Sequence, residues 1–462
     1  MGQNGSKIFE LINSYVKENW NNMVEEARNL IRMPSISATG EGIEETAIYL
    51  RDWIKERLGG QATLLRYGGH PIVYGKVRGS SEKKVIVYNM YDVQPPDPIE
   101  LWEVPPFEAR IVGDKIVARG SYNSKGALMG SLLGLEALLR STGELPFTTY
   151  IVLEGEEELG SRSMPKFVED KKSELEGSLV TYFAFPSESI PGKPWIILGN
   201  RGLVYIEVKA KTSKYDVHSS YSRGFYNPVA LLSKIISHML DPNEGPRLPW
   251  LEEKAIGPME EDLKYLQDIK EASPMEEIMN SYGIYKPRIY GDDWYIATHF
   301  KPTVNVDGII AGYTGSGTKT IIPSEATMKL DFRLVPGIEP EDVVKGFGDL
   351  IRRLGLEEMV EYKVLNSYTW GKTDPKSPAV EIAKRTYSDL GLKSYIIPIL
   401  PGSAPSYLFT RVLKTAMIDT APGSGARAHA PNEFITVDTV PRTAQYTALF
   451  MEKLRLHLTL TL

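Results

Sequence analysis

The sequence predicts an α/β protein whose first domain is discontinuous and is interrupted by an inserted α+β domain. Apolar strands alternate with helical segments up to about residue 198, which is the pattern of a sheet covered by helices. From about residue 199, "RGLVYIEVKAKTS" alternates with period two, as a half-solvated antiparallel strand does. After about residue 370 the strand–helix alternation returns. We therefore expect residues 1–198 and 370–462 to form one domain and residues 199–369 the other.

The first domain begins with helices, predicted over 7–33 and 43–57 from the spacing of apolar residues. The runs "ATLLRY", "PIVYGKV" and "KVIVYNMY" predict strands, and "KGALMGSLLGLEALLRS" (125–141) predicts a helix whose small residues permit close packing. "TTYIVLEGEEELGS" indicates a strand that runs out into an acidic loop. Polar residues at the strand ends should gather at one edge of the sheet, where such folds place their sites.

The inserted domain combines an antiparallel sheet with amphipathic helices. Helices are predicted at "YNPVALLSKIISHML" (226–240) and "PEDVVKGFGDLIRRLGL", and further strands at "PTVNVDGIIAGYTG" and "TMKLDFRLVPG". The stretch 250–290 is polar and is expected to be irregular, as a flap would be. Beyond residue 370, "SPAVEIAKRTYSDLGL", "YIIPILPGSAPS", "TAMIDT" and a last helix near 440–458 complete the first domain.

Composition excludes several classes of protein. A net charge of -6 over 462 residues lacks the basic excess of a nucleic-acid binder. The chain contains no cysteine, so disulfides, thiolate metal sites and a cysteine nucleophile are excluded. No basic flank precedes an apolar core at the N-terminus, and no apolar run is long enough to span a membrane. We expect a cytoplasmic protein without membrane or nucleic-acid partners.

Six stretches occur in an order and spacing that together are specific, although each alone is a weak signal. They are "MYDVQPPDPIELWEVPPFEARIVGDKIVARGSYNSKG", "LEGEEELGS", "DVHSS", "GTKTIIP…DFRLVPG", "PGSAPS" and "ARAHAPNEF". With them, nearly the whole chain resembles the M20 metallopeptidases, the group of carboxypeptidase G, carnosinase and acetylornithine deacetylase, and it is most similar to the dipeptidase-like branch. The resemblance implies a zinc-peptidase-like α/β/α domain with an inserted lid that also serves for dimerisation.

The resemblance also implies a mechanism and a set of residues. Enzymes of this kind use two zinc ions with a bridging water and a bridging aspartate, and a glutamate takes a proton from the water before it attacks an amide carbonyl. Carried over to this sequence, the roles are general base for Glu157, metal ligand for Glu158 and His429, orienting residue for Asp92, oxyanion stabilisation across a dimer interface for His218, and binding of a substrate carboxylate for Arg333, Gly402 and Ser403.

The sequence departs from this pattern at one of the two metals. Its three protein ligands, a histidine and two aspartates, correspond to Met90, Asn123 and Ser187, although a one-residue shift would place Glu188 at the last position. Zinc prefers imidazole, thiolate or carboxylate ligands, whereas a thioether is soft and neutral. Two divalent ions would be left with little compensating charge, and buried uncompensated charge is costly.

The same residues could have purely structural roles instead of the functional roles given above. The acidic loop could be a solvated charge run, His429 a hydrogen-bonded structural histidine, His218 a residue bonded to its own loop, and Arg333 a surface or interface arginine. "RGSYNSKG" could hold a phosphate, because Gly, Ser and Lys open a helix there.

Two hypotheses of function follow. The first is a non-hydrolytic homologue that binds a peptide-like or carboxylate-bearing ligand, or a partner protein, without metal. The second is an active amidohydrolase or dipeptidase with a single Zn²⁺ on Glu158, His429 and the Asn123 oxygen, and with Glu157 as base. Under either hypothesis we expect a homodimer formed through the lid, with a higher assembly as an alternative.

Overall fold

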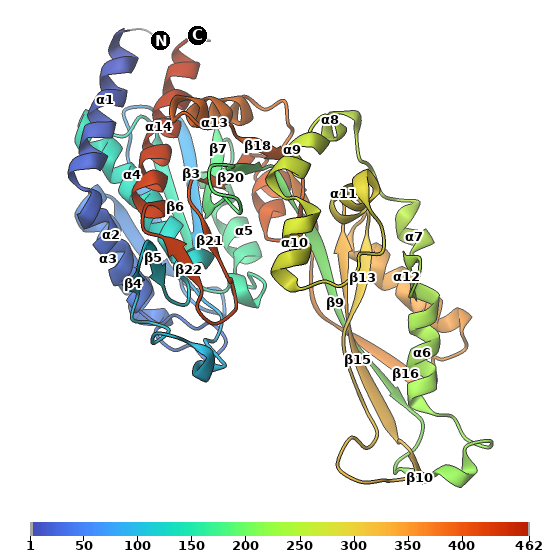
Figure 1. The fold of residues 1–462 in the computed structure, drawn as a ribbon. Helices are drawn as coiled ribbons and strands as arrows, with labels where there is room; N and C mark the ends of the chain where they lie inside the picture. The colour runs from blue at the N-terminus through green and yellow to red at the C-terminus, as the bar shows by residue number, and fades with distance from the viewer. Residues whose placement is uncertain (1–2, 461–462) are drawn as a thin grey trace.

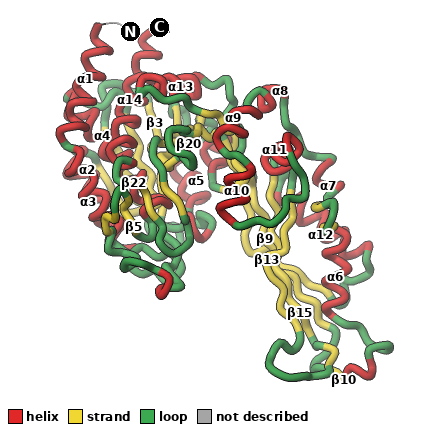
Figure 2. The backbone as a smooth tube through the Cα atoms, in the orientation of Figure 1, coloured by secondary structure: helices red, strands yellow, loops and turns green. Residues whose placement is uncertain are grey.

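The first domain is built on a twisted sheet of eight strands with helices on both faces (Figures 1 and 2). The computed structural model describes residues 3–460. The strands are, in spatial order, β1 (Gln61–Leu65), β2 (Ile72–Val77), β6 (Thr148–Glu154), β3 (Lys84–Met90), β7 (Val180–Pro186), β20 (Ala416–Ala421), β8 (Trp195–Ile197) and β18 (Tyr395–Ile397). The central strands β6, β3, β7 and β20 run parallel, so their carboxyl ends meet at one edge.

One face of this sheet is covered by six helices and the other by one helix and an irregular turn. The six are α1 (Gln3–Glu18), α2 (Trp20–Arg32), α3 (Ile43–Leu58), α4 (Gly126–Thr142), α13 (Pro378–Asp389) and α14 (Thr439–Leu460), and they contribute to one large apolar core. The opposite face packs against α5 (Met164–Leu175) and the turn at Leu408–Val412. The fold class predicted from strand–helix alternation is confirmed.

A small second sheet lies beside the main one and carries two loops of interest. Its strands are β21 (Gly425–Ala426), β22 (Phe434–Thr436), β5 (Lys115–Val117) and β4 (Arg110–Val112), in that spatial order. The loop between β21 and β22 contains His429, and the segment after β5 leads to Asn123. Pairing of β22 with β5 therefore brings these two loops together although more than 300 residues separate them.

The inserted domain is a sheet in the order β13–β15–β9–β16, with its helices packed on one face. Its strands are β9 (Gly199–Lys211), β13 (Thr303–Ala311), β15 (Glu325–Leu334) and β16 (Val360–Tyr368). Along β9, buried and half-buried residues alternate, and the buried ones pack against α6 (Pro228–Met239) and α12 (Pro340–Arg353). At its far tip lie β10 (Val217–His218) and β14 (Ile321–Ile322) (Figure 1).

The stretch predicted to be an irregular flap is instead helical. It forms α7 (Pro249–Glu252), α8 (Glu260–Leu263), α9 (Leu266–Ala272) and α10 (Met275–Tyr282), preceded by β11 (Leu240–Asp241) and β12 (Gly245–Pro246) and followed by α11 (Gly291–Phe300). Apolar side chains of α9, α10 and α11 share a core with β8 and β18. This part of the insert is thus packed against the edge of the first domain's sheet.

Two chain segments connect the domains, and they run side by side. β17 (Gly371–Lys372) pairs with the start of β9, and β19 (Leu400–Ser403) also pairs with β9. The backbone N–H of Thr373 donates to the carbonyl of Leu198 at 2.6 Å. Within residues 3–460, no helix is long and apolar enough to cross a membrane.

Candidate functional site

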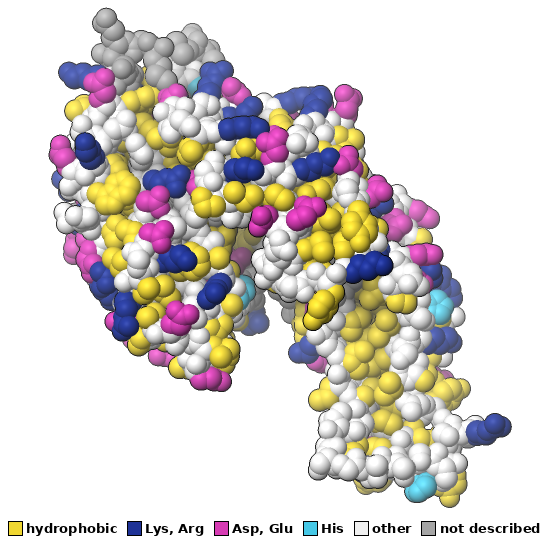
Figure 3. Space-filling model, viewed as in Figure 1, with side chains coloured by type: hydrophobic (Ala, Val, Ile, Leu, Met, Phe, Trp, Pro, Cys, Tyr) yellow, Lys and Arg dark blue, Asp and Glu magenta, His cyan; other side chains and the backbone are white. Residues whose placement is uncertain are grey.

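The predicted site residues Met90, Asp92, Glu157 and Glu158 gather at the carboxyl edge of the sheet. Met90 is the last residue of β3, and the parallel register pairs it with Glu154, the last residue of β6. The loops that follow these two strands carry the other three residues. The surface is hollowed between the two domains (Figure 3).

Asp92 organises the loop after β6. Its carboxylate is buried and accepts hydrogen bonds from the backbone N–H groups of Glu157 (3.1 Å) and Glu158 (3.0 Å). Burial, and after it the charge of Glu158, raises the pKa of Asp92 to about 7. Asp92 therefore holds the two glutamates in position through their backbone.

The carboxylate of Glu158 is occupied by three side chains. Its Oε1 accepts from Nδ2 of Asn123 at 2.7 Å and lies 3.0 Å from Nε2 of His429, while its Oε2 accepts from Nε2 of Gln94 at 2.9 Å. Asn123 and His429 also contact each other, at 2.9 Å. The hydrogen bond that the His429 ring donates to Glu158 raises the pKa of His429, which favours an imidazolium beside the carboxylate. Gln94 was not foreseen, because a lone glutamine after a strand carries no signal of its own.

Glu157 and Glu154 share a crowded, poorly solvated environment. Desolvation, and then the charge of Glu158, raises the pKa of Glu157 well above its ordinary value. Glu154 is buried and accepts from the hydroxyls of Tyr88 and of Ser161. Burial raises the pKa of Glu154 to about 8. The site is thus prone to hold protons on carboxyl groups rather than several negative charges.

The loop that carries Asn123 is held by a buried carboxylate. Glu433 accepts from the backbone N–H groups of Asn123 (2.8 Å), Tyr122 (3.0 Å) and Gly120 (3.1 Å), and from the guanidinium of Arg119 at 2.6 Å. The carboxylate of Glu433 thus already occupies the backbone N–H groups of "RGSYNSKG" that were considered as a phosphate site. His429, four residues before Glu433, has a φ of 63°, a left-handed backbone that directs its loop back towards Asn123.

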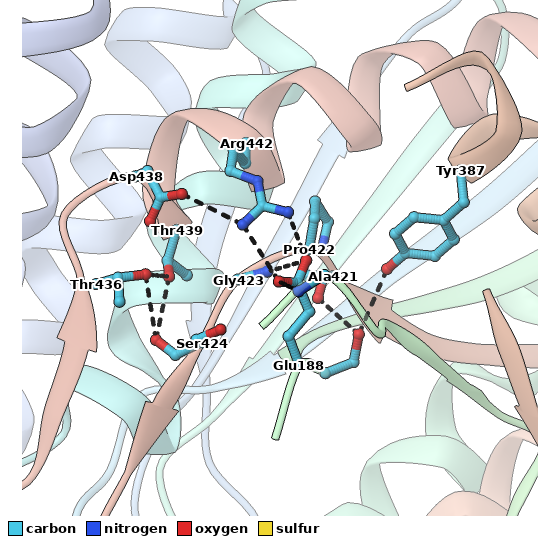
Figure 4. Close-up of polar contacts among 12 residues, drawn as sticks. Glu188, Tyr387, Ala421, Pro422, Gly423, Ser424, Thr436, Asp438, Thr439 and Arg442 are labelled. Carbon is cyan, nitrogen blue, oxygen red and sulfur yellow. Dashed lines mark hydrogen bonds and ion pairs between the residues drawn. The ribbon is translucent and has the colours of Figure 1, made fainter. Parts of the chain in front are cut away.

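Ser187, the residue predicted at the third lost ligand position, lies away from this group. Its hydroxyl donates to the carbonyl of Ala421 at 2.7 Å and is near the hydroxyl of Tyr387. Its neighbour Glu188 points to Arg442 and accepts from the N–H of Gly423 (Figure 4). The side-chain oxygens of Ser187 and Glu188 are therefore directed away from the group formed by Glu158 and His429.

The strand register brings Phe185, rather than Ser187, level with Met90. β7 pairs with β3 so that Tyr88 lies opposite Phe183, and two residues further on Met90 is level with Phe185. The ring of Phe185 packs against that of Tyr122, with centroids 5.3 Å apart. The correspondence of Ser187 to the third ligand position stays a prediction, and Phe185 is the alternative that the strand register offers.

The predicted carboxylate-binding residues come together at the junction of the domains. Nη1 of Arg333 donates to Oγ of Ser403 at 2.9 Å, and its Nε donates to Asp331 at 2.6 Å. Gly402 precedes Ser403 on β19. The charge of Glu157 contributes to raising the pKa of Tyr368, after burial, and Tyr368 also contacts Ser403. Tyr368 thus connects the two groups of residues.

His218 lies far from these residues within one chain. It ends β10 at the tip of the inserted domain, is exposed, and its Nδ1 accepts from the backbone N–H of Ser220 at 3.1 Å (Figure 1).

The site contains few side chains that can act as metal ligands. Within the described residues, no group of three or more His, Cys, Asp or Glu side chains is arranged to hold an ion. Glu158 and His429 are the pair that could contribute, and the amide nitrogen of Asn123 donates to Glu158 and lies 2.9 Å from Nε2 of His429. Met90 and Phe185 offer sulfur and carbon where carboxylate or imidazole would be needed. These residues do not fit two divalent cations.

Comparison with known proteins gives a consistent result. The sequence family described as peptidase family M20/M25/M40 matches residues 86–453. The chain is 24% identical over 470 residues to the Cys-Gly metallodipeptidase dug1 of Schizosaccharomyces pombe, covering 94% of each protein. It is 25% identical to the probable di- and tripeptidase DUG2 of Saccharomyces cerevisiae, with 78% of this chain spanning 42% of that protein. The structure of the M20 family metallo-carboxypeptidase Sso-CP2 from Sulfolobus solfataricus superposes with a TM-score of 0.88 and 32% identity, covering 94% of this chain and 99% of that one.

Proposed function

Because this chain belongs to peptidase family M20/M25/M40, we propose that it binds a peptide-like, carboxylate-bearing ligand in the cleft between its domains without di-metal hydrolysis. Its relatives include dipeptidases, which supports a peptide-like ligand. The changed residues at the carboxyl edge of the sheet argue against the chemistry of two metal ions.

The observation that carries the proposal is the occupied state of Glu158. Asn123, Gln94 and His429 direct hydrogen-bond donors at its two oxygens, so the carboxylate is satisfied by the protein itself. A cation would have to displace these hydrogen-bond donors, and in return it would have only one carboxylate and one imidazole as protein ligands. Two divalent ions would require several further anionic ligands to offset their desolvation, which costs several kcal/mol per ion.

The binding side of the proposal rests on Arg333 and Ser403. A guanidinium and a hydroxyl in contact form a suitable receptor for a carboxylate, because arginine can donate two parallel hydrogen bonds. In this proposal Gly402 allows the ligand to approach the backbone closely. His218 reaches the cleft of a second copy in a homodimer formed through the inserted domain.

A second candidate is an amidohydrolase with a single zinc ion, and the contact between Glu158 and His429 favours it. These two side chains are 3.0 Å apart and could share one ion, with the Asn123 oxygen as third ligand after rotation of its amide. Glu157, whose pKa is raised, would hold and release the proton of the attacking group. Zinc bound in this way would supply a Lewis acid for the carbonyl.

Metal analysis and a peptide assay separate the two candidates. We expect less than one equivalent of zinc in the purified protein after dialysis, no turnover of Ala-Leu with added Zn²⁺, Co²⁺ or Mn²⁺, and binding of Ala-Leu by calorimetry. One equivalent of metal together with turnover that Glu157→Gln abolishes would establish the second candidate instead.

Restoration of ligands tests the assignment of the site. The triple variant Met90→His/Asn123→Asp/Phe185→Asp should bind zinc at least tenfold more tightly than the parent. Replacing Phe185→Asp by Ser187→Asp in the same background is the matched control and should give a smaller gain. Equal zinc affinity of the two triple variants would contradict the register-based assignment.

A further inference from the structure

We propose that Arg201 is a second guanidinium of the carboxylate-binding site, so that the ligand's carboxylate lies between Arg201 and Arg333. This inference rests on the proposed binding of a carboxylate-bearing ligand and adds a residue to it. No sequence motif identified Arg201.

The strand register puts Arg201 beside the predicted site. Arg201 is the third residue of β9, and its Cα pairs with that of Ser403 on β19. Two residues further along β9, Leu203 pairs with Arg333 on β15, so the side chains of Arg201 and Arg333 project from the same face of the sheet. Ser403 therefore contacts Arg333 through its hydroxyl and lies next to Arg201 through its backbone.

Arg201 is buried but only partly satisfied. It is 2% exposed, and its Nη2 donates to the carbonyls of Ala297 and Thr298, in the last turn of α11. Its Nε has no hydrogen-bond partner among residues 3–460. Buried side-chain nitrogens without a partner are uncommon, and an unsatisfied donor on a charged group is costly.

The charge balance around Arg201 also calls for an anion. Arg333 has Asp331 as its partner, whereas no ion pair joins Arg201 to a carboxylate in the described part of the chain. Desolvation, and then the nearby charge of Arg333, lowers the pKa of Arg201 to about 9. His299 is buried beside it, and burial lowers the pKa of His299 to about 4, so this side chain stays neutral near pH 7. Arg333 is paired with Asp331, which also contacts Asp307, whereas a ligand carboxylate would give Arg201 the partner that it lacks among the described residues.

A purely structural role would be to brace α11, since carbonyls at a helix C-terminus accept hydrogen bonds from arginine. That role uses Nη2 and explains neither the free Nε nor the missing carboxylate partner of Arg201 among the described residues. The two roles differ in what they predict for ligand binding, because a brace does not distinguish a ligand carboxylate from an uncharged amide.

The test compares Ala-Leu with Ala-leucinamide, which differ in the charge of the C-terminal group. Affinities are measured by calorimetry in EDTA, so that zinc-dependent turnover cannot consume the peptide. We expect the wild type to favour the acid at least tenfold. Arg201→Met should weaken binding of the acid roughly tenfold to a hundredfold and leave binding of the amide unchanged.

Further variants keep the test decisive if Arg201→Met folds poorly. Arg201→Lys preserves the charge but not the planar fork, and should also lose most of the preference for the acid. Thr298→Val removes the hydroxyl that Thr298 donates to the carbonyl of Trp294 but keeps the backbone carbonyl that Arg201 contacts. Exposed Arg352→Met is the remote control, and both variants should keep the preference. Arg201 variants that melt earlier yet keep the preference would overturn this inference alone. A wild type that binds neither peptide would overturn the proposed function as well.

Discussion

Asn123→Asp is the substitution that most directly probes the proposed metal-free site. In the folded protein the amide nitrogen of Asn123 donates to Glu158 at 2.7 Å. The variant places a second carboxylate oxygen at that distance from Glu158 and removes the donor. Without a cation, the two carboxylates repel each other unless one of them takes up a proton. The substitution should therefore destabilise the protein in a pH-dependent way.

Two quantities limit the loss of stability: the repulsion between two charged carboxylates and the cost of protonating one of them. Two unit charges 2.7 Å apart repel by about 6 kcal/mol at an effective dielectric constant of about 20. Protonation of the new carboxyl avoids this repulsion and costs about 1.4 kcal/mol for each pH unit above its ordinary pKa of about 3.9. The penalty is thus about 1.5 kcal/mol at pH 5 and about 5.5 kcal/mol at pH 8, close to the repulsion limit. An imidazolium at His429 reduces the latter figure, so we expect about 2–5 kcal/mol at pH 8.

The sign of the pH dependence is fixed by the direction of the pKa shift. A carboxyl whose pKa is raised on folding loses stability as pH rises from its unfolded to its folded value. Urea denaturation in EDTA at pH 5, 6.5 and 8 should therefore show a growing gap between the variant and the wild type, and excess Zn²⁺ should narrow it. Exposed Asn21→Asp is the control and should change stability by less than about 0.5 kcal/mol. A variant as stable as the wild type at pH 8 in EDTA would refute this reasoning.

Two other substitutions test the electrostatics of the site and of the domain junction. Glu157→Gln should raise the free energy of unfolding at pH 8 but not at pH 4, by about 1.4 kcal/mol for each unit by which folding raises the pKa of Glu157. A gain that is equal at both pH values in urea denaturation would contradict the raised pKa. Lys372→Met should cost about 3–5 kcal/mol and expose α8 to proteolysis, because it leaves Asp262 buried without its partner at 2.5 Å. The double variant Lys372→Met/Asp262→Leu should recover most of that loss, and a single variant as protease-resistant as the wild type would rule this out.

The sequence was sufficient for the fold class and for the residues at the ends of β3 and β6. Long apolar strands followed by charged residues, such as the run that ends in Met90 and Asp92, define both a strand and its functional edge. The structure brings Asp92, Glu157, Glu158, Asn123 and His429 together, as predicted, because each follows a strand or lies on a loop tied to one. Their predicted roles remain proposals.

The sequence was insufficient where long-range pairing decides the position of a side chain. Phe185 and Ser187 lie on the same short segment, and only the register between β3 and β7 determines which one is level with Met90. Arg201 looks like one polar residue in an alternating strand, and its importance depends on the neighbouring strands β15 and β19. The helices α9–α11 were missed because they are short and acquire their stability from packing on β8 and β18.

The contact of α9–α11 with the edge of the main sheet has a consequence for ligand entry. Rotation of the inserted domain about its two paired connections would have to separate Tyr295 and Phe300 from the first domain's apolar residues. The cleft should therefore be preorganised, and its width should be nearly the same before and after binding. Association would then involve little conformational entropy, and its rate would be set by diffusion into an open groove rather than by a closing motion.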